Sequence, residues 1–181
     1  LDIIYENSDV IFINKPSGML SQKAKPEDVS LVEYLIAHLI HKGELNAGDL
    51  ASFKPGICNR LDRNTSGIVA AGKTTKGLQQ LSEAFKQRNL GKYYLCIVKG
   101  NVDKRALIKG YLYKDNKTNK VTISRTETKD SLPIETEYIP VCSNGNVTLL
   151  KIHLLTGRSH QIRAHLASIG HPLIGDYKYG Q

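Results

Sequence analysis

Long apolar runs and cysteine pairs are lacking in this chain of 181 residues. No run approaches the roughly 18 apolar residues of a membrane-spanning helix, and no charged and then apolar stretch opens the chain as a signal peptide would. The cysteines are widely spaced and include no Cys-x-x-Cys pair: Cys58, Cys96 and Cys142. Neither a disulfide framework nor a zinc site is indicated, and we expect a reducing, cytoplasmic compartment without membrane association.

Acidic side chains are also fewer than basic ones. The chain has 25 Lys and Arg residues against 17 Asp and Glu residues, which gives a formal net charge of +8 and an isoelectric point near 9.3. This balance favours a polyanionic partner such as nucleic acid. The hydrophobic content of 40% is ordinary for a soluble globular protein, and the length predicts one domain. Because the chain starts at Leu1 rather than Met, we expect a fragment of a longer protein.

One stretch imitates a nucleotide-binding motif. Residues 67–74, GIVAAGKT, fit the phosphate-binding pattern G-x-x-x-x-G-K-[ST]. A phosphate loop needs a flexible segment whose backbone N–H groups curl around the phosphates. The four central residues here are apolar, partly β-branched and free of glycine, so they predict a buried strand. A nucleotide hydrolase is therefore disfavoured.

Hydrophobic periodicity predicts an α+β fold, in which helical spacing early in the chain gives way to alternation later. The first half is predicted to contain a strand at residues 10–14 and a helix that begins at a capping box of Ser30 and Glu33 and ends at Gly43. A strand around Ile68 and a second helix follow, and this helix is capped by Thr74 or Thr75 and ends near Asn89. The second half is predicted to hold strands at 93–98, 121–125, 135–141 and 147–154, an Asn144-Gly145 hairpin, and a helix from Ser159 to Gly170.

A polar turn, RLDRNTSG at residues 60–67, precedes the strand around Ile68. If the turn begins extended, Arg60 and Asp62 lie on the same side. Neighbouring cations favour an ionised carboxylate, which suits a nucleophile or a base. The alternative is that Asp62 caps the turn and pairs with Arg60 or Arg63 as part of the structure.

A second polar cluster lies at residues 156–176, TGRSHQIRAHLASIGHPLIGD. Arg158 and His160 lie where a loop enters the last predicted helix. Arg163 lies at the margin of the buried face of that helix, where it needs an acidic partner or a phosphate. His160 and His165 are five residues apart rather than four, so they do not form a metal site of the metalloprotease kind, and we expect both on the helix surface.

Four stretches taken together resemble the RluA-like family of RNA pseudouridine synthases. They follow one another over essentially the whole chain: NKPSG at 14–18, RLDRNTSGIVAAGKT at 60–74, KYYLCIVKG at 92–100, and the cluster at 156–176. The resemblance implies a mixed, mainly antiparallel sheet with packed helices, and it makes residues 1–181 the catalytic domain. An upstream S4-type RNA-binding domain and a C-terminal strand and helix, which many members carry, would be absent.

The resemblance implies an isomerase that breaks the N1–C1′ bond of uridine, turns the detached uracil and joins C5 to C1′ without cofactor or metal. Asp62 would be the catalytic aspartate, either as a nucleophile at C1′ or as a base at the ribose 2′ position. Arg163 would pair with Asp62 and hold it ionised. Tyr94 would stack on the target base, and Arg60 would replace the flipped uridine in the RNA stack. Further RNA contacts would come from Arg63, Lys73, Arg158 and His160, with Lys73 facing the RNA backbone or solvent.

The expected substrate is large-subunit (23S) ribosomal RNA, with tRNA as the alternative, and the expected enzyme is a monomer involved in ribosome biogenesis. A non-catalytic RNA-binding or ribosome-assembly module is the rival from another class. One position departs from the family pattern, because Asn59 stands where His usually precedes R-L-D. We expect this change to alter a turn contact and no chemical step.

Overall fold

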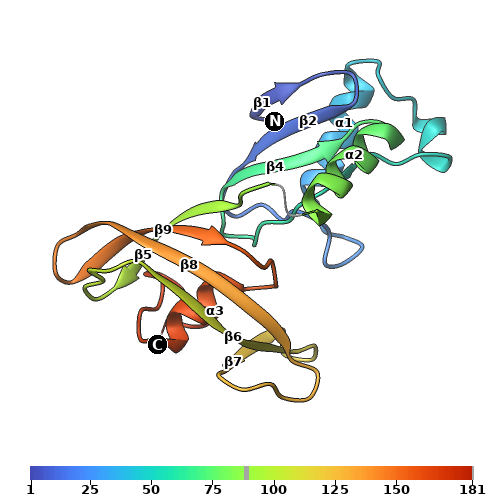
Figure 1. The fold of residues 1–181 in the computed structure, drawn as a ribbon. Helices are drawn as coiled ribbons and strands as arrows, with labels where there is room; N and C mark the ends of the chain where they lie inside the picture. Colours follow the sequence, from blue (N-terminus) through green and yellow to red (C-terminus); the bar gives the residue numbers. More distant parts are fainter. Residues whose placement is uncertain (88–89, 181) are drawn as a thin grey trace. The chain divides into compact units, whose positions relative to one another are not determined.

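The chain folds into two compact units, Leu1–Leu90 and Gly91–Gln181 (Figure 1). The computed structural model describes residues 1–87 and 90–180. Both units combine antiparallel strands with packed helices, so the predicted α+β class is confirmed. The single domain expected from the length is thus built from two parts. Within the described ranges, no helix is long and apolar enough to cross a membrane.

The described part of the first unit contains a four-stranded antiparallel sheet in the order β1-β2-β4-β3. Its elements are β1 (Ile3–Glu6), β2 (Val10–Lys15), α1 (Leu31–His41), the 3-10 helix η1 (Ala47–Ala51), β3 (Gly56–Ile57), β4 (Gly67–Gly72) and α2 (Thr75–Lys86). The predicted capping box of α1 is present, since the Glu33 carboxylate accepts bonds from the Ser30 N–H and hydroxyl. α2 ends at Lys86, and the predicted end near Asn89 lies outside the described residues.

The stretch that imitates a phosphate loop is strand β4 followed by the start of α2. Gly72 and Gly77 allow α2 to approach the sheet, because a Cβ at Gly72 would lie 2.5 Å from the Leu78 nitrogen and one at Gly77 would collide with the Asp9 carbonyl oxygen. Thr74 caps α2, and its Oγ1 accepts a bond from the Gly77 N–H at 3.1 Å. Glycine and threonine here serve packing and capping, which confirms the rejection of the phosphate-loop interpretation.

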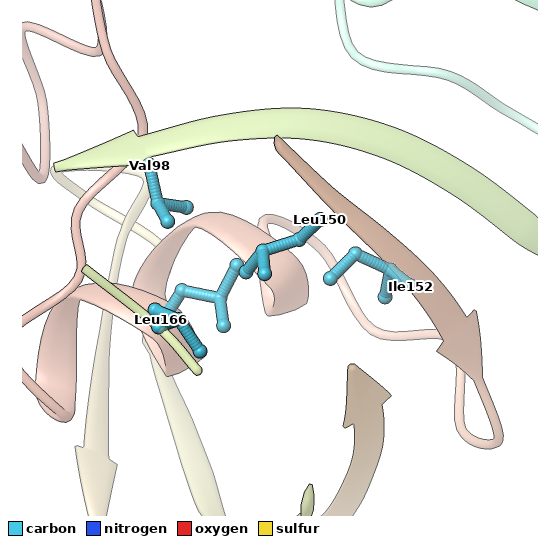
Figure 2. Packing of buried hydrophobic residues seen from close by; sticks show 5 residues of the cluster. Val98, Leu150, Ile152 and Leu166 are labelled. Carbon is cyan, nitrogen blue, oxygen red and sulfur yellow. The ribbon is translucent and has the colours of Figure 1, made fainter. Parts of the chain in front are cut away.

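The described part of the second unit contains a five-stranded antiparallel sheet in the order β5-β9-β8-β6-β7, with α3 packed on it. Its elements are β5 (Tyr93–Lys99), β6 (Ala106–Asp115), β7 (Lys120–Ser124), β8 (Leu132–Ser143), β9 (Val147–Leu154) and α3 (Gln161–Ser168). The four predicted strands and the Asn144-Gly145 hairpin are confirmed, whereas β6 was not predicted. Figure 2 shows the apolar core, in which Val98, Leu150, Ile152 and Leu166 meet.

A chain of buried polar groups lies under α3. His165 is 2% exposed, and its Nδ1 lies 3.0 Å from the Thr136 hydroxyl. Gln161 Nε2 donates to the same hydroxyl at 3.0 Å and to the Glu135 carbonyl at 3.1 Å. The expectation that His165 lies on the helix surface is therefore wrong. The residue spacing along α3 did not reveal this burial, because the partner Thr136 lies on a separate element, strand β8.

Burial lowers the pKa of His165 from 6.5 to about 4, while a hydrogen bond with the Lys109 backbone opposes the shift. The unfolded chain then binds a proton more readily than the folded chain between these two values. The neutral ring stabilises the fold fully above pH 6.5, and this contribution falls as the pH drops toward 4. Acid should therefore weaken the second unit through this residue.

We predict that the stability difference between wild type and His165→Gln changes with pH. Between pH 7.5 and pH 5.0, wild type should lose about 2 kcal/mol of unfolding free energy relative to the variant, because only wild type carries the buried imidazole. Urea titrations at both values measure the change, with His41→Gln on the exposed surface of α1 as the control. An equal pH dependence in wild type and His165→Gln would contradict the prediction.

Candidate active site

Asp62 lies in the loop that joins β3 to β4 and is half-buried. The loop turns at this residue, since the Thr65 N–H donates to the Asp62 carbonyl oxygen at 3.0 Å. Arg60 and Arg63 flank the aspartate and are exposed. The predicted polar turn ahead of a strand is therefore confirmed, and it presents one carboxylate between two cationic side chains.

A buried lysine holds the backbone on the C-terminal side of Asp62. Lys15, at the end of β2, has no exposed surface, and its ammonium donates to the carbonyl oxygens of Pro16 at 2.9 Å, Met19 at 2.8 Å and Arg63 at 3.2 Å. The Gly18 N–H donates to the same Arg63 oxygen at 2.8 Å. Burial lowers the pKa of Lys15, and the charge of Asp62 opposes that shift. Lys15 thus joins the turn at residues 16–19 to the Asp62 loop.

A buried serine holds the backbone on the N-terminal side. Ser21 Oγ donates to the Leu61 carbonyl oxygen at 2.7 Å and accepts from the Leu61 N–H at 3.0 Å. Ser17 Oγ donates to the Asn64 carbonyl oxygen at 2.9 Å. The segment from Lys15 to Ser21 therefore fixes the residues on both sides of Asp62. Such fixation suits a reacting group, because a carboxylate on a held loop needs little reorganisation.

Asn59 extends the pairing of β3 with β4 by means of its side chain. Its Nδ2 donates to the Ile68 carbonyl oxygen at 3.1 Å, and its Oδ1 accepts from the Ala70 N–H at 2.8 Å. The amide thereby takes the place of a strand backbone just before Arg60. The position at which the chain departs from the family pattern thus has a defined structural role.

Lys73 requires a correction. Its side chain is 6% exposed, and its ammonium pairs with Glu6 at 2.7 Å and with Glu44. It also donates to the Asn7 carbonyl oxygen at 2.8 Å. The expectation that Lys73 faces solvent or the RNA backbone is therefore wrong, because two carboxylates from distant parts of the chain enclose it.

The second unit carries Tyr94, Arg158, His160 and Arg163. Tyr94 is half-buried on β5 and packs beside the core of Figure 2, while Tyr93 points the other way with 56% exposure. Arg158 is exposed, and His160 precedes α3 with its Nδ1 2.8 Å from the Tyr179 hydroxyl. These positions agree with the predicted alternation on β5 and with the predicted junction of loop and helix.

Arg163 has the acidic partner that its position predicted. Its Nε and Nη2 donate to the two oxygens of Asp176 at 2.6 Å and 2.9 Å. The family resemblance implied Asp62 as this partner, and Asp176 was not predicted; the pairing of Arg163 with Asp62 stays a prediction. Four residues in or next to the motifs have contacts in the site that the sequence did not predict: Lys15, Ser21, Asp176 and Tyr179.

Comparison with known proteins decides the family. The sequence model of the family described as RNA pseudouridylate synthase matches residues 9–168. This chain belongs to the RNA pseudouridylate synthase family. A protein of Borreliella burgdorferi named ribosomal large subunit pseudouridine synthase D is 35% identical over 182 residues, which cover 99% of this chain and 54% of the relative. A protein of the same name from Zymomonas mobilis is 32% identical and is covered to 56%.

Solved structures agree on the fold of this chain. Human RNA pseudouridylate synthase domain containing protein 1 superposes with a TM-score of 0.78 at 23% identity, covering 100% of this chain and 70% of the human one. The predicted pseudouridine synthase fold is thereby confirmed. The chain spans about half the length of the curated relatives described above. In the part of the chain that the structure describes, no group of three or more His, Cys, Asp or Glu residues is arranged to hold a metal ion.

We predict that Ser21→Ala destabilises the first unit more than Ser17→Ala. Removing the buried Ser21 hydroxyl leaves both polar groups of Leu61 without that partner, at a cost of about 1 to 3 kcal/mol. Ser17 makes one exposed bond, so its loss should cost about 0.5 kcal/mol or less. Urea unfolding of both variants measures the difference, and equal losses would show that Ser21 does not hold the loop.

Proposed function

We propose that this chain is the catalytic part of an RNA pseudouridine synthase that acts on uridines of large-subunit ribosomal RNA. Membership of the family and the names of the two relatives support the reaction and the substrate class. The observation that carries the proposal is Asp62, a half-buried carboxylate on a loop that Lys15 and Ser21 hold on both sides. The net charge of +8 suits a polyanionic substrate.

The proposed reaction is an isomerisation within one nucleotide. The N1–C1′ bond breaks, the uracil turns, C5 bonds to C1′, C5 loses its proton and N1 gains one. Asp62 acts either as a nucleophile at C1′ or as a base that removes the ribose 2′ proton. Both routes need a charged carboxylate, and the buried ammonium of Lys15 interacts electrostatically with Asp62.

The remaining predicted site residues fall into two groups according to their exposure to solvent. Tyr94 and Arg163 are half-buried, which suits contact with the extruded base or the catalytic carboxylate. Arg60, Arg63 and Arg158 are exposed, which suits insertion into the RNA stack or contact with phosphates. His160 lies at the same junction as Arg158 and is proposed as a further phosphate contact.

We predict that Asp62→Asn abolishes tritium release from C5-tritiated ribosomal RNA. The amide keeps the shape of the side chain but cannot act as a nucleophile or base, so the rate should fall by about 10³-fold or more. Counting released tritium with wild type, Asp62→Asn and the exposed control Asp103→Asn measures the effect. Mapping the modified positions in large-subunit RNA and tRNA transcripts identifies the substrate.

The outcomes separate the rival functions. Release from large-subunit RNA that only Asp62→Asn loses supports the proposal, and release from tRNA alone would replace the substrate. RNA binding without release in wild type would favour a non-catalytic module. Full activity in Asp62→Asn would remove the aspartate from the mechanism.

We also predict that RNA binding depends on salt through the exposed arginines. The logarithm of the binding constant should fall linearly with the logarithm of salt concentration, by about 0.7 to 0.9 per phosphate neutralised. Arg158→Ala should reduce this slope by about one phosphate contact, whereas Lys76→Ala, whose charge is paired with Asp9, should leave it unchanged. Filter binding at several salt concentrations tests both, and an unaltered slope in Arg158→Ala would exclude a phosphate contact there.

A further inference from the structure

The turn that follows α3 binds the guanidinium of Arg163 through the carboxylate of Asp176. Asp176 accepts from Nε at 2.6 Å and from Nη2 at 2.9 Å, so both carboxylate oxygens contact one edge of the guanidinium group. The Asp176 side chain is 6% exposed and that of Arg163 is 25% exposed. A two-pronged pair of this kind fixes the plane of the guanidinium as well as its position.

The ring of Tyr179 covers the same guanidinium. The Arg163 Cζ lies 5.2 Å from the ring centroid, within the range of a cation–π contact. The phenol oxygen is itself held, because it lies 2.8 Å from His160 Nδ1 and accepts from the Val121 N–H at 3.1 Å. The ring that covers Arg163 is therefore tied to the start of α3 and to β7.

Asp176 is held in turn by its own loop. Its Oδ1 accepts from the N–H groups of Lys178 at 3.0 Å and Tyr179 at 3.3 Å. The hydrogen bond from Arg163 contributes most to lowering the pKa of Asp176, and burial opposes it. The carboxylate thus remains charged at neutral pH. We call Asp176 together with Tyr179 the Arg163 clamp.

We propose that Asp176 and Tyr179 are positioning residues that fix the guanidinium of Arg163 for the isomerisation. The inference rests on the proposed function, which makes Arg163 a site residue. A half-buried arginine on a short helix would otherwise sample several rotamers, and a small displacement of a group that assists a reaction costs rate. The clamp acts through Arg163, so its loss lowers kcat and leaves the binding of RNA nearly unchanged.

The alternative is that the clamp only holds the turn at residues 175–180 against α3. A double-mutant cycle distinguishes the positioning role from this purely structural role. If Asp176 acts through Arg163, Asp176→Asn lowers kcat in wild type and has no further effect in an Arg163→Met background. A purely structural tie would instead leave the kcat of the folded enzyme unchanged.

The first experiment measures kcat and KM for tritium release by Asp176→Asn, Tyr179→Leu and Tyr179→Phe. Asp176→Asn should lower kcat by about 10- to 100-fold with KM within about two-fold of wild type. Tyr179→Leu removes the ring and should lower kcat more than Tyr179→Phe, which keeps the ring and loses only the hydroxyl contacts. The exposed Asp103→Asn variant serves as the control, and circular dichroism confirms folding.

The second experiment follows the Arg163 Nε proton by ¹⁵N nuclear magnetic resonance and needs no activity. Its exchange with water should be slowed in wild type and at least about ten-fold faster in Asp176→Asn, because the bond to Oδ2 is lost. An Nε proton that exchanges equally fast in both proteins would overturn the clamp itself.

The results distinguish this inference from the proposed function. A wild type that modifies no RNA overturns the proposed function and the catalytic meaning of the clamp, while the Nε measurement still decides the clamp's existence. An active wild type with an undiminished kcat in Asp176→Asn overturns the positioning role alone. A loss of kcat that is additive with Arg163→Met would also overturn it.

Discussion

The ammonium of Lys15 is the contact on which the candidate site depends. A lysine without exposed surface is costly unless its three donors are used, and here all three meet backbone carbonyl oxygens. One of these oxygens belongs to Arg63, the residue after Asp62. The buried charge therefore fixes the turn at residues 16–19 and the Asp62 loop in one arrangement, and it places a positive charge near the Asp62 carboxylate.

Residues 67–74 match the phosphate-loop pattern because α2 packs closely on the sheet of the first unit. Gly72 and Gly77 are needed because the helix approaches the sheet closely, Thr74 caps the helix, and Lys73 is enclosed by Glu6 and Glu44. In this chain, the residues that match the phosphate-loop pattern form a strand, a helix cap and a buried ion pair. They do not form a phosphate loop, because the backbone at residues 67–72 is extended.

In the second unit, α3 carries both the side chains that fix it on the sheet and the predicted site residue Arg163. Its buried side directs Gln161 and His165 into a polar chain with Thr136, which fixes the helix on the sheet. Its margin carries Arg163, which the turn after the helix grips through Asp176. A helix anchored by specific hydrogen bonds can hold a guanidinium more firmly than one anchored by apolar packing alone, since hydrogen bonds also fix its rotation.

The sequence by itself determined the α+β class, four of the strands in the second half, the turn at Asp62 and the family, because these follow from local periodicity, turn residues and ordered motifs. Only the tertiary structure decided the partners of Lys15, Lys73, His165 and Arg163. Lys73 meets Glu6 across 67 positions of sequence, and Lys15 meets Arg63 across 48. Local patterns fix which side chains are charged or apolar, but the burial of a charge depends on which distant groups the fold brings to it.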